Sequence, residues 1–220
     1  MPGPTASPPQ PPDLPSDLER AEISLLAHDA SYTETELADV VLPNQQARGV
    51  TFDTTRLVNV DVTGSQLDDL RLTDSTLKGC NLANTQAQRA AATRVTIETS
   101  RLTGIHLAEA TLRDVTIRDC RIDLASFGFS RLTRVTFERC MPTQTDFLDA
   151  QLESVRFHHC DLTRADFRGA RMQRCEFRRS DLTGLQGIAN LRGSAMEWPD
   201  IVEMAGTWAA ALGIEVLDID

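Results

Sequence analysis

Five cysteines are the residues of this 220-residue chain whose chemistry could serve a metal or redox site. Their number is odd and no two of them form a CxxC pair, so a disulfide scaffold and a zinc knuckle are both poor interpretations. Three of them recur at intervals of twenty positions, so their role depends on the elements that hold them. The five are Cys80, Cys120, Cys140, Cys160 and Cys175.

Two adjacent histidines are the other candidates for metal chemistry. His158 and His159 are predicted to face outward near Arg139, Arg178 and Arg179. A metal site needs more donors than this group offers, so we interpret it as a polar surface patch, with contact to an anion or a partner as the alternative. The sequence has no Walker loop, GxSxG or HExxH motif. We therefore predict no catalytic residue, no cofactor, no bound metal and no enzymatic activity.

A five-residue period organises most of the chain. Every fifth residue from Leu37 to Leu182 gives 30 positions, of which 26 are large and apolar. Two residues before each, from Thr35 to Ser180, 27 of 30 positions are Ala, Ser, Cys, Thr or Val. In an α-helix successive centres would drift by about 140°, and in a plain strand every second centre would face the wrong side. The period therefore fits a chain that turns a corner after each unit, with one large and one small side chain pointing inward. All five cysteines occupy the small inward position, where buried cysteine behaves as a small hydrophobe.

The units NLANT, HLAEA, DLTRA, DFRGA and DLTGL carry a family resemblance. Units of this form resemble those of the pentapeptide-repeat family. The resemblance implies an all-β fold, a right-handed quadrilateral β-helix in which four units, or twenty residues, make each coil. About 7–8 coils then fit into residues 37–187.

Coils of this length place side chains in columns. One predicted column holds Phe127, Phe147 and Phe167 and another holds Phe137, Phe157 and Phe177, each as a stack of rings ~4.8 Å apart. Two weak points are also predicted. Ala87 and Ala92 leave one coil thinly filled, and Pro142 removes a ladder N–H from a centre position.

The repeat region is flanked by segments of different character. Residues 1–16 hold seven of the ten prolines and are predicted to be a disordered tail. Residues 17–36 are predicted to be an N-terminal cap segment. Residues 188–220 are predicted to contain a helix and a short final strand over residues 214–217, which together cap the open end of the solenoid.

The predicted C-terminal helix has clear boundary signals. Pro199 and Asp200 favour its start and Gly213 its end. Its apolar face is predicted to hold Ile201, Ala205, Trp208 and Leu212, widened by Val202, Met204 and Ala209. This surface is larger than a simple cap requires, so capping alone and capping with homodimerisation both stay open.

Candidate contact residues therefore lie in two places. Phe129 is the only phenylalanine outside a centre position and is predicted to form a small exposed apolar patch with Leu124 and Leu148. The C-terminal segment adds Trp198, Ile201, Met204, Trp208 and Leu212.

The charge pattern bears on partners. The net charge is −10 and the isoelectric point near 4.9, which argues against direct nucleic-acid binding. Residues 1–112 carry −7, residues 113–182 carry +2 and residues 183–220 carry −5. The most acidic face is predicted to hold Asp68, Asp69, Glu109, Asp146, Asp149 and Asp166, interrupted by Arg48, Arg89 and Arg168. Another face, with Arg94, Arg113, Arg131, Arg134, Arg171 and Arg174, is predicted to be net basic.

Three hypotheses follow. The leading one is a non-enzymatic scaffold that acts through protein–protein interaction with a partner that the sequence does not name. The second comes from the resemblance, because members of the family protect type II topoisomerases by mimicking DNA. It is a DNA-gyrase-binding protein that confers fluoroquinolone tolerance, but a continuous acidic face is missing. The third is an enzyme or metal binder. No stretch approaches 18 apolar residues and the first residues do not resemble a secretory signal, so we expect a cytoplasmic location without membrane contact.

Overall fold

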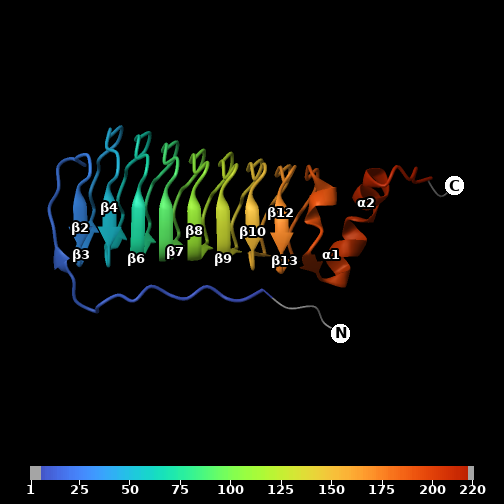
Figure 1. The fold of residues 1–220 in the computed structure, drawn as a ribbon, viewed down its shortest axis with the longest axis horizontal. Helices are drawn as coiled ribbons and strands as arrows, with labels where there is room; N and C mark the ends of the chain where they lie inside the picture. The colour runs from blue at the N-terminus through green and yellow to red at the C-terminus, as the bar shows by residue number, and fades with distance from the viewer. Residues whose placement is uncertain (1–5, 218–220) are drawn as a thin grey trace.

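Parallel strands stack along a rod in a right-handed, four-sided β-solenoid of about nine turns (Figure 1). The computed structural model describes residues 6–217. The strands are β1 (Glu19–Arg20), β2 (Ser31–Thr33), β3 (Thr35–Ala38), β4 (Thr51–Asp53), β5 (Arg56–Val58), β6 (Arg71–Lys78), β7 (Ala91–Glu98), β8 (Thr111–Arg118), β9 (Arg131–Glu138), β10 (Gln151–Glu153), β11 (Arg156–His158), β12 (Arg171–Gln173), β13 (Cys175–Arg178) and β14 (Ser194–Met196). Helical segments are η1 (Ile188–Leu191), α1 (Trp198–Glu203) and α2 (Ala205–Ala211).

The strand register confirms the predicted coil length of twenty residues. Leu57 pairs with Leu77 and Phe157 with Phe177, each pair one coil apart in parallel register. The prediction of 7–8 coils is lower than the observed number because it rests only on residues that follow the strict five-residue period. Coils of other lengths extend the rod at both ends, since β1 pairs with β3 at an offset of sixteen positions and β13 with β14 at an offset of nineteen.

A left-handed residue makes each corner. Every fifth residue from position 29 to position 184 has a positive φ, and among the non-glycine residues φ lies between 43° and 60°. Such a backbone is unfavourable for most residue types, and asparagine, aspartate and glycine tolerate it best. Gly64 shows why some corners need glycine, because a Cβ there would lie 2.7 Å from the Asn44 side-chain oxygen of the preceding coil.

Aromatic columns fill the C-terminal half of the interior, as predicted. Phe147 stacks between Phe127 and Phe167 with ring centroids 5.2 and 4.7 Å away. The second column repeats this geometry, with Phe157 5.0 Å from Phe137 and 5.1 Å from Phe177. Rings of the two columns meet edge to face at 5.7–6.3 Å, so each buried phenylalanine has both stacked and perpendicular neighbours.

Both predicted weak points are visible in the core. A cavity of about 40 Å³ is lined by Ala87 and Ala92, where larger centre residues fill other coils. Pro142 is buried at a centre position and has no N–H to donate. The row of bridges that links Arg121 to Met141 stops there and resumes only between Asp161 and Asp181.

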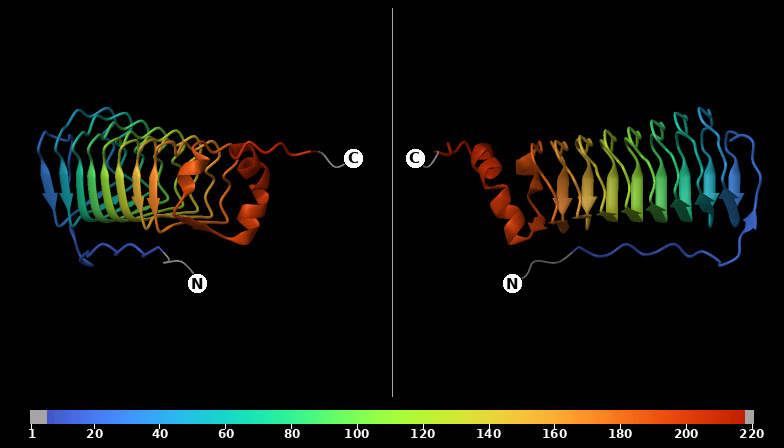
Figure 2. Two further views of the ribbon diagram at one scale, coloured as in Figure 1. Left: turned by 45° about the vertical axis from the view of Figure 1, so that its right-hand side comes forward. Right: turned by 180° about the vertical axis from the view of Figure 1, so that it is seen from behind.

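The two ends differ from the sequence prediction. Residues 6–16 lie extended along the outside of the rod, tied to it by hydrogen bonds, where a disordered tail was predicted for residues 1–16 (Figures 1 and 2). Residues 1–5 lie outside the described part. No strand forms over residues 214–217, and the last strand is β14, which precedes the helices. The end of the sheet is already covered at that point, so the apolar residues 214–217 have no edge to join.

Candidate functional surfaces

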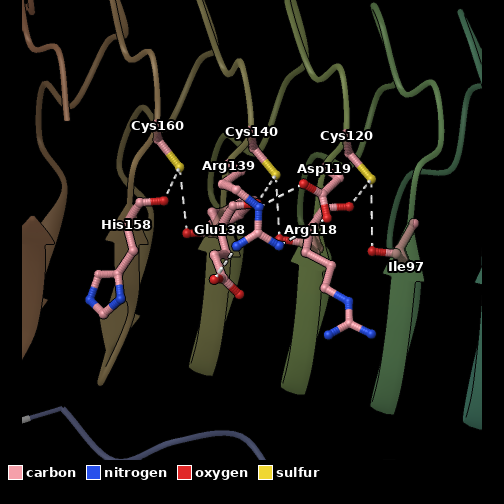
Figure 3. A network of polar contacts seen from close by, with 11 residues as sticks. Ile97, Arg118, Asp119, Cys120, Glu138, Arg139, Cys140, His158 and Cys160 are labelled. Atoms are coloured by element: carbon pink, nitrogen blue, oxygen red, sulfur yellow. Dashed lines mark hydrogen bonds and ion pairs between the residues drawn. The ribbon is translucent and has the colours of Figure 1, made fainter. Parts of the chain in front are cut away.

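The stacked cysteines are core residues. Cys120, Cys140 and Cys160 lie one above another in consecutive coils, and each thiol points to two backbone carbonyls (Figure 3). All five cysteines are free and buried. Burial raises the pKa of the Cys80 thiol and that of Cys175, the latter to about 11. Such thiols are protonated at neutral pH and are poor nucleophiles and poor metal ligands.

The histidine patch separates into unrelated contacts. His158 is half-buried, and its Nε2 atom lies 3.5 Å from Oε2 of Glu176, which also forms an ion pair with Arg178 Nε at 3.2 Å. Burial lowers the pKa of His158. His159 is exposed at a corner. Within residues 6–217, no group of three or more His, Cys, Asp or Glu side chains could hold a metal ion.

The acidic face is neutralised in part by arginines from the same and from neighbouring coils. Arg48 Nε lies 2.6 Å from Asp69, and Arg89 Nε lies 3.0 Å from the same carboxylate. Arg168 Nη2 lies 2.7 Å from Oδ2 of Asp166. Arg89, followed by Arg48, holds the pKa of Asp69 below its usual range. The repeating coil register places the other predicted members on the same side: Asp68, Glu109, Asp146 and Asp149.

Phe129 interrupts this face. It is 62% exposed with φ of 59° and stands in the corner column between Glu109 and Asp149. Leu124 is exposed at the other corner of the same side, and Leu148 is half-buried on the next coil. The three predicted patch residues therefore lie on one side of the rod, among carboxylates. An aromatic ring breaks the row of charges there, in a backbone conformation that disfavours it.

The C-terminal helices cover the open end of the rod (Figure 2). The predicted single helix breaks at Met204, which is buried, and Trp208 is half-buried against the core. Ile201 lies at the edge, 37% exposed, and Leu212 points into solvent with Trp198, each of them 75% exposed. The capping face is thus narrower than the predicted face, because Ile201 and Leu212 lie largely outside it. Asp200 is buried and accepts the N–H of Arg179 at 3.0 Å, which ties α1 to the last regular coil.

A largely apolar groove lies between the cap helices and the last coil, and it opens to solvent. Exposed side chains continue past α2 into residues 214–217, which are open to solvent. The groove is lined by Leu191, Ser194, Met196, Trp198, Ile201, Val202, Ala205, Trp208, Ala209, Leu212 and Ile214. No helix in the described chain is both long enough and apolar enough to cross a membrane.

Comparison with known proteins agrees with the geometry of the coils. Residues 70–142 and 131–186 match the family described as pentapeptide repeat region, which is more than half of the chain. The chain belongs to the pentapeptide-repeat family.

Solved pentapeptide-repeat structures are similar to this chain. Full-length QnrB1, described as a plasmid-mediated fluoroquinolone resistance protein, shares the fold and is 18% identical over 90% of this chain and 100% of its own, with a TM-score of 0.53. HetL from the cyanobacterium Nostoc sp. strain PCC 7120, described as involved in heterocyst differentiation regulation, is 18% identical over 79% of this chain and 91% of its own, with a TM-score of 0.45. No curated protein matches the sequence significantly.

One feature of this pentapeptide-repeat rod was missed from the sequence. The face predicted to be basic is a ladder of ion pairs, because Arg94 binds Asp74 and Arg134 binds Asp114, each partner one coil away. The N-terminal segment lies on this ladder. The signal was present as acidic and basic residues alternating from coil to coil, over Asp74, Arg94, Asp114 and Arg134.

Proposed function

We propose that this chain is a non-enzymatic interaction scaffold whose C-terminal cap joins two copies into a homodimer. The observation that carries the proposal is the apolar outer surface of the cap. Trp198 and Leu212 are each 75% exposed, and Val202 and Ile214 are exposed beside them. Contiguous apolar surface of this kind usually marks an interface.

A second copy is the occupant that the surface fits best. Symmetric dimers are the commonest oligomers, and one self-complementary patch is enough to form them. A patch at the end of a rod allows two rods to join end to end without covering their sides. Residues 183–220 carry one basic and six acidic residues, so like charges should oppose the contact and added salt should strengthen it.

Tryptophan fluorescence tests this proposal, because the chain has only Trp198 and Trp208. With rising protein concentration, the emission of the wild type should shift to shorter wavelength as Trp198 leaves water. The variant Val202→Asp should show no shift. Leu25→Asp is the control, since Leu25 is exposed at the other end of the rod. A wild-type spectrum independent of concentration would count against the dimer.

A gyrase-binding DNA mimic is the alternative. Family membership and the similarity to QnrB1, a fluoroquinolone resistance protein, support it. The charges do not, because Asp69 and Asp166 are paired with arginines where phosphate mimicry needs free negative charge. A gyrase supercoiling assay separates the two functions: protection from a fluoroquinolone would favour the mimic. The absence of catalysis and a cytoplasmic location are further parts of the scaffold proposal.

A further inference from the structure

The N-terminal segment is bound to the rod through its backbone. Residues 6–16 run from the C-terminal coils toward β3 along one side (Figures 1 and 2). Three of their N–H groups donate to carboxylates on three different coils. The bonds are Ala6 N to Glu176 Oε1 at 2.9 Å, Gln10 N to Asp114 Oδ1 at 3.1 Å and Asp13 N to Asp74 Oδ1 at 3.0 Å.

Arginines of the rod bind the carbonyl oxygens of the same segment. Arg56 Nη2 donates to Pro15 O at 3.2 Å and to Ser16 O at 3.4 Å. Arg156 donates to Ala6 O. The rod therefore contacts both kinds of backbone group, and these bonds do not depend on the side chains of the segment.

The spacing of the donors matches the spacing of the coils. Gln10 and Asp13 are three residues apart, and their acceptors Asp114 and Asp74 are two coils apart. A polyproline II helix has three residues per turn and advances ~9.3 Å in that length, while two coils span ~9.6 Å. A polyproline II chain also has no internal hydrogen bonds, so its N–H and C=O groups are free to bind a partner.

The sequence of the segment has the same three-residue period. Over SPPQPPDLPS, a non-proline residue recurs at every third position, and prolines occupy most of the other positions. Ser7, Gln10, Asp13 and Ser16 are the four residues in phase. Proline holds the extended conformation. Gln10 and Asp13, in the middle of this pattern, are the two in-phase residues whose N–H groups bind the rod.

The acceptors are held in place by the ion-pair ladder. Arg134 binds Asp114 through two bonds of 2.6 Å, and Arg94 Nε binds Asp74 at 2.6 Å. Asp114 is 3% exposed and Glu176 4% exposed. The carboxylates are therefore fixed by the rod. Both oxygens of each aspartate accept from arginine, and Oδ1 of each accepts an N–H of the segment in addition.

The bound segment contributes little to the core. Ala6 is its one buried residue, and the side chain of Ala6 is a single methyl group. From residue 7 to residue 16 no residue is fully buried, and Pro9, Pro12 and Leu14 are half-buried. Attachment mainly through polar backbone contacts, without a large buried apolar anchor, is suited to exchange with another chain.

We propose that this side of the rod is a binding site for extended proline-rich peptides of the pattern X-Pro-Pro-X-Pro-Pro, and that residues 6–16 are its displaceable resident occupant. The partner is a proline-rich segment of another protein, since the rod contacts the backbone of the segment and not its particular side chains. The inference extends the scaffold proposal to a second surface and does not involve the cap, so the fluorescence test of the cap and the peptide test of this site can fail separately.

Peptide binding to the full-length chain tests this inference. The variant Gln10→Pro/Asp13→Pro removes two donors of the resident segment, leaves its extended conformation and does not alter the solenoid, which circular dichroism can verify. A fluorescent peptide of residues 6–16 is titrated with the wild type and with the variant. Because the tethered segment competes at high effective concentration, the peptide should bind the variant at least about tenfold more tightly than the wild type.

A second peptide is the control for backbone recognition. It carries proline in place of both Gln10 and Asp13, and it should bind the variant at least about tenfold more weakly than the native peptide, because two hydrogen bonds to carboxylates are lost. Equal binding of the two peptides would overturn recognition through N–H donors. Failure of the native peptide to bind the variant would overturn the site, and equal affinity for wild type and variant would overturn the role of residues 6–16 as its occupant.

Discussion

Arg134 forms a bidentate ion pair with Asp114 of the preceding coil, with Nε 2.6 Å from Oδ1 and Nη2 2.6 Å from Oδ2. The aspartate side chain is 4% exposed and the arginine side chain 25% exposed, so the pair is screened little by solvent. Bidentate pairs of this geometry are among the stronger polar contacts in proteins.

The pair predicts a pH-dependent stability. Arg134 foremost, with help from the N–H of Gln10, holds the pKa of Asp114 below its usual range. A carboxylate with a depressed folded pKa stabilises the protein above its unfolded pKa of ~3.9, and this contribution is lost as pH falls through the folded pKa. Asp114→Asn should therefore lower the free energy of unfolding by about 1–3 kcal/mol near neutral pH, and the difference should shrink below pH ~4.

Denaturant unfolding of both proteins at several pH values measures this effect. Glu109→Gln is the control, because Glu109 is also a corner carboxylate but is exposed and has no ion pair within the described residues. A difference between wild type and Asp114→Asn that stays constant with pH would contradict the assignment.

Pro142 offers a site for stabilisation. The corresponding residues one coil before and after, Ile122 and Leu162, donate their N–H groups to Met141 O at 3.3 Å and to Asp181 O at 2.8 Å. Pro142→Leu restores the missing donor and should raise the free energy of unfolding by about 0.5–1.5 kcal/mol. Thermal unfolding measures the change. Pro142→Ala restores the N–H with a smaller side chain and separates the two contributions. A lower melting temperature for the leucine variant would show that the coil needs proline.

The phenylalanine columns predict a large loss on truncation. Phe147→Ala removes a fully buried ring from between two stacked neighbours and should cost about 3–5 kcal/mol. Phe129→Ala is the matched control, since its ring is exposed and its loss should change the stability little. Equal effects of the two substitutions in denaturant unfolding would mean that the columns contribute no more than surface rings.

The cysteines predict thiols without reactivity in the native state. All five are buried, and the pKa of Cys175 is raised to about 11. A hydrogen bond with Cys140 lowers the pKa of Cys160, but burial keeps reagents from this thiol as well. A thiol reagent at mildly alkaline pH should label no cysteine in the folded chain and five after denaturation. Arg101→Cys places a thiol on the exposed surface and should be labelled at once, as a control for the reagent. Rapid labelling of a cysteine in the folded chain would contradict this prediction and would support a redox role for that thiol.

The interior of the fold could be predicted, because each inward position in the sequence is marked by a single property, a large or a small apolar side chain. The five-residue period predicts the inward position of seven phenylalanines and all five cysteines, and it predicts a missing N–H donor at Pro142. The left-handed backbone at the corners was not predicted, since Leu124 and Phe129 adopt a conformation that their residue types disfavour.

The structure of the two ends of the chain could not be predicted from the five-residue period, because the period does not extend into them. The helix break at Met204 follows from packing against the last coil, and the residues that point outward depend on that break. The proline content of the N-terminal segment predicts disorder. Its three-residue pattern predicts binding only when the acceptors Asp74 and Asp114 are known to lie in line. These two residues are far apart in the sequence and come into line only when the coils stack.

The central claim is that the cap joins two copies, and the mass of the full-length chain in solution tests it most directly. Multi-angle light scattering at high protein concentration should give twice the chain mass of 24.3 kDa for the wild type, and the single-chain mass for Trp198→Asp. Trp198 is chosen because it is exposed, whereas Trp208 packs on the core. A wild-type mass of 24.3 kDa at every concentration would contradict the claim.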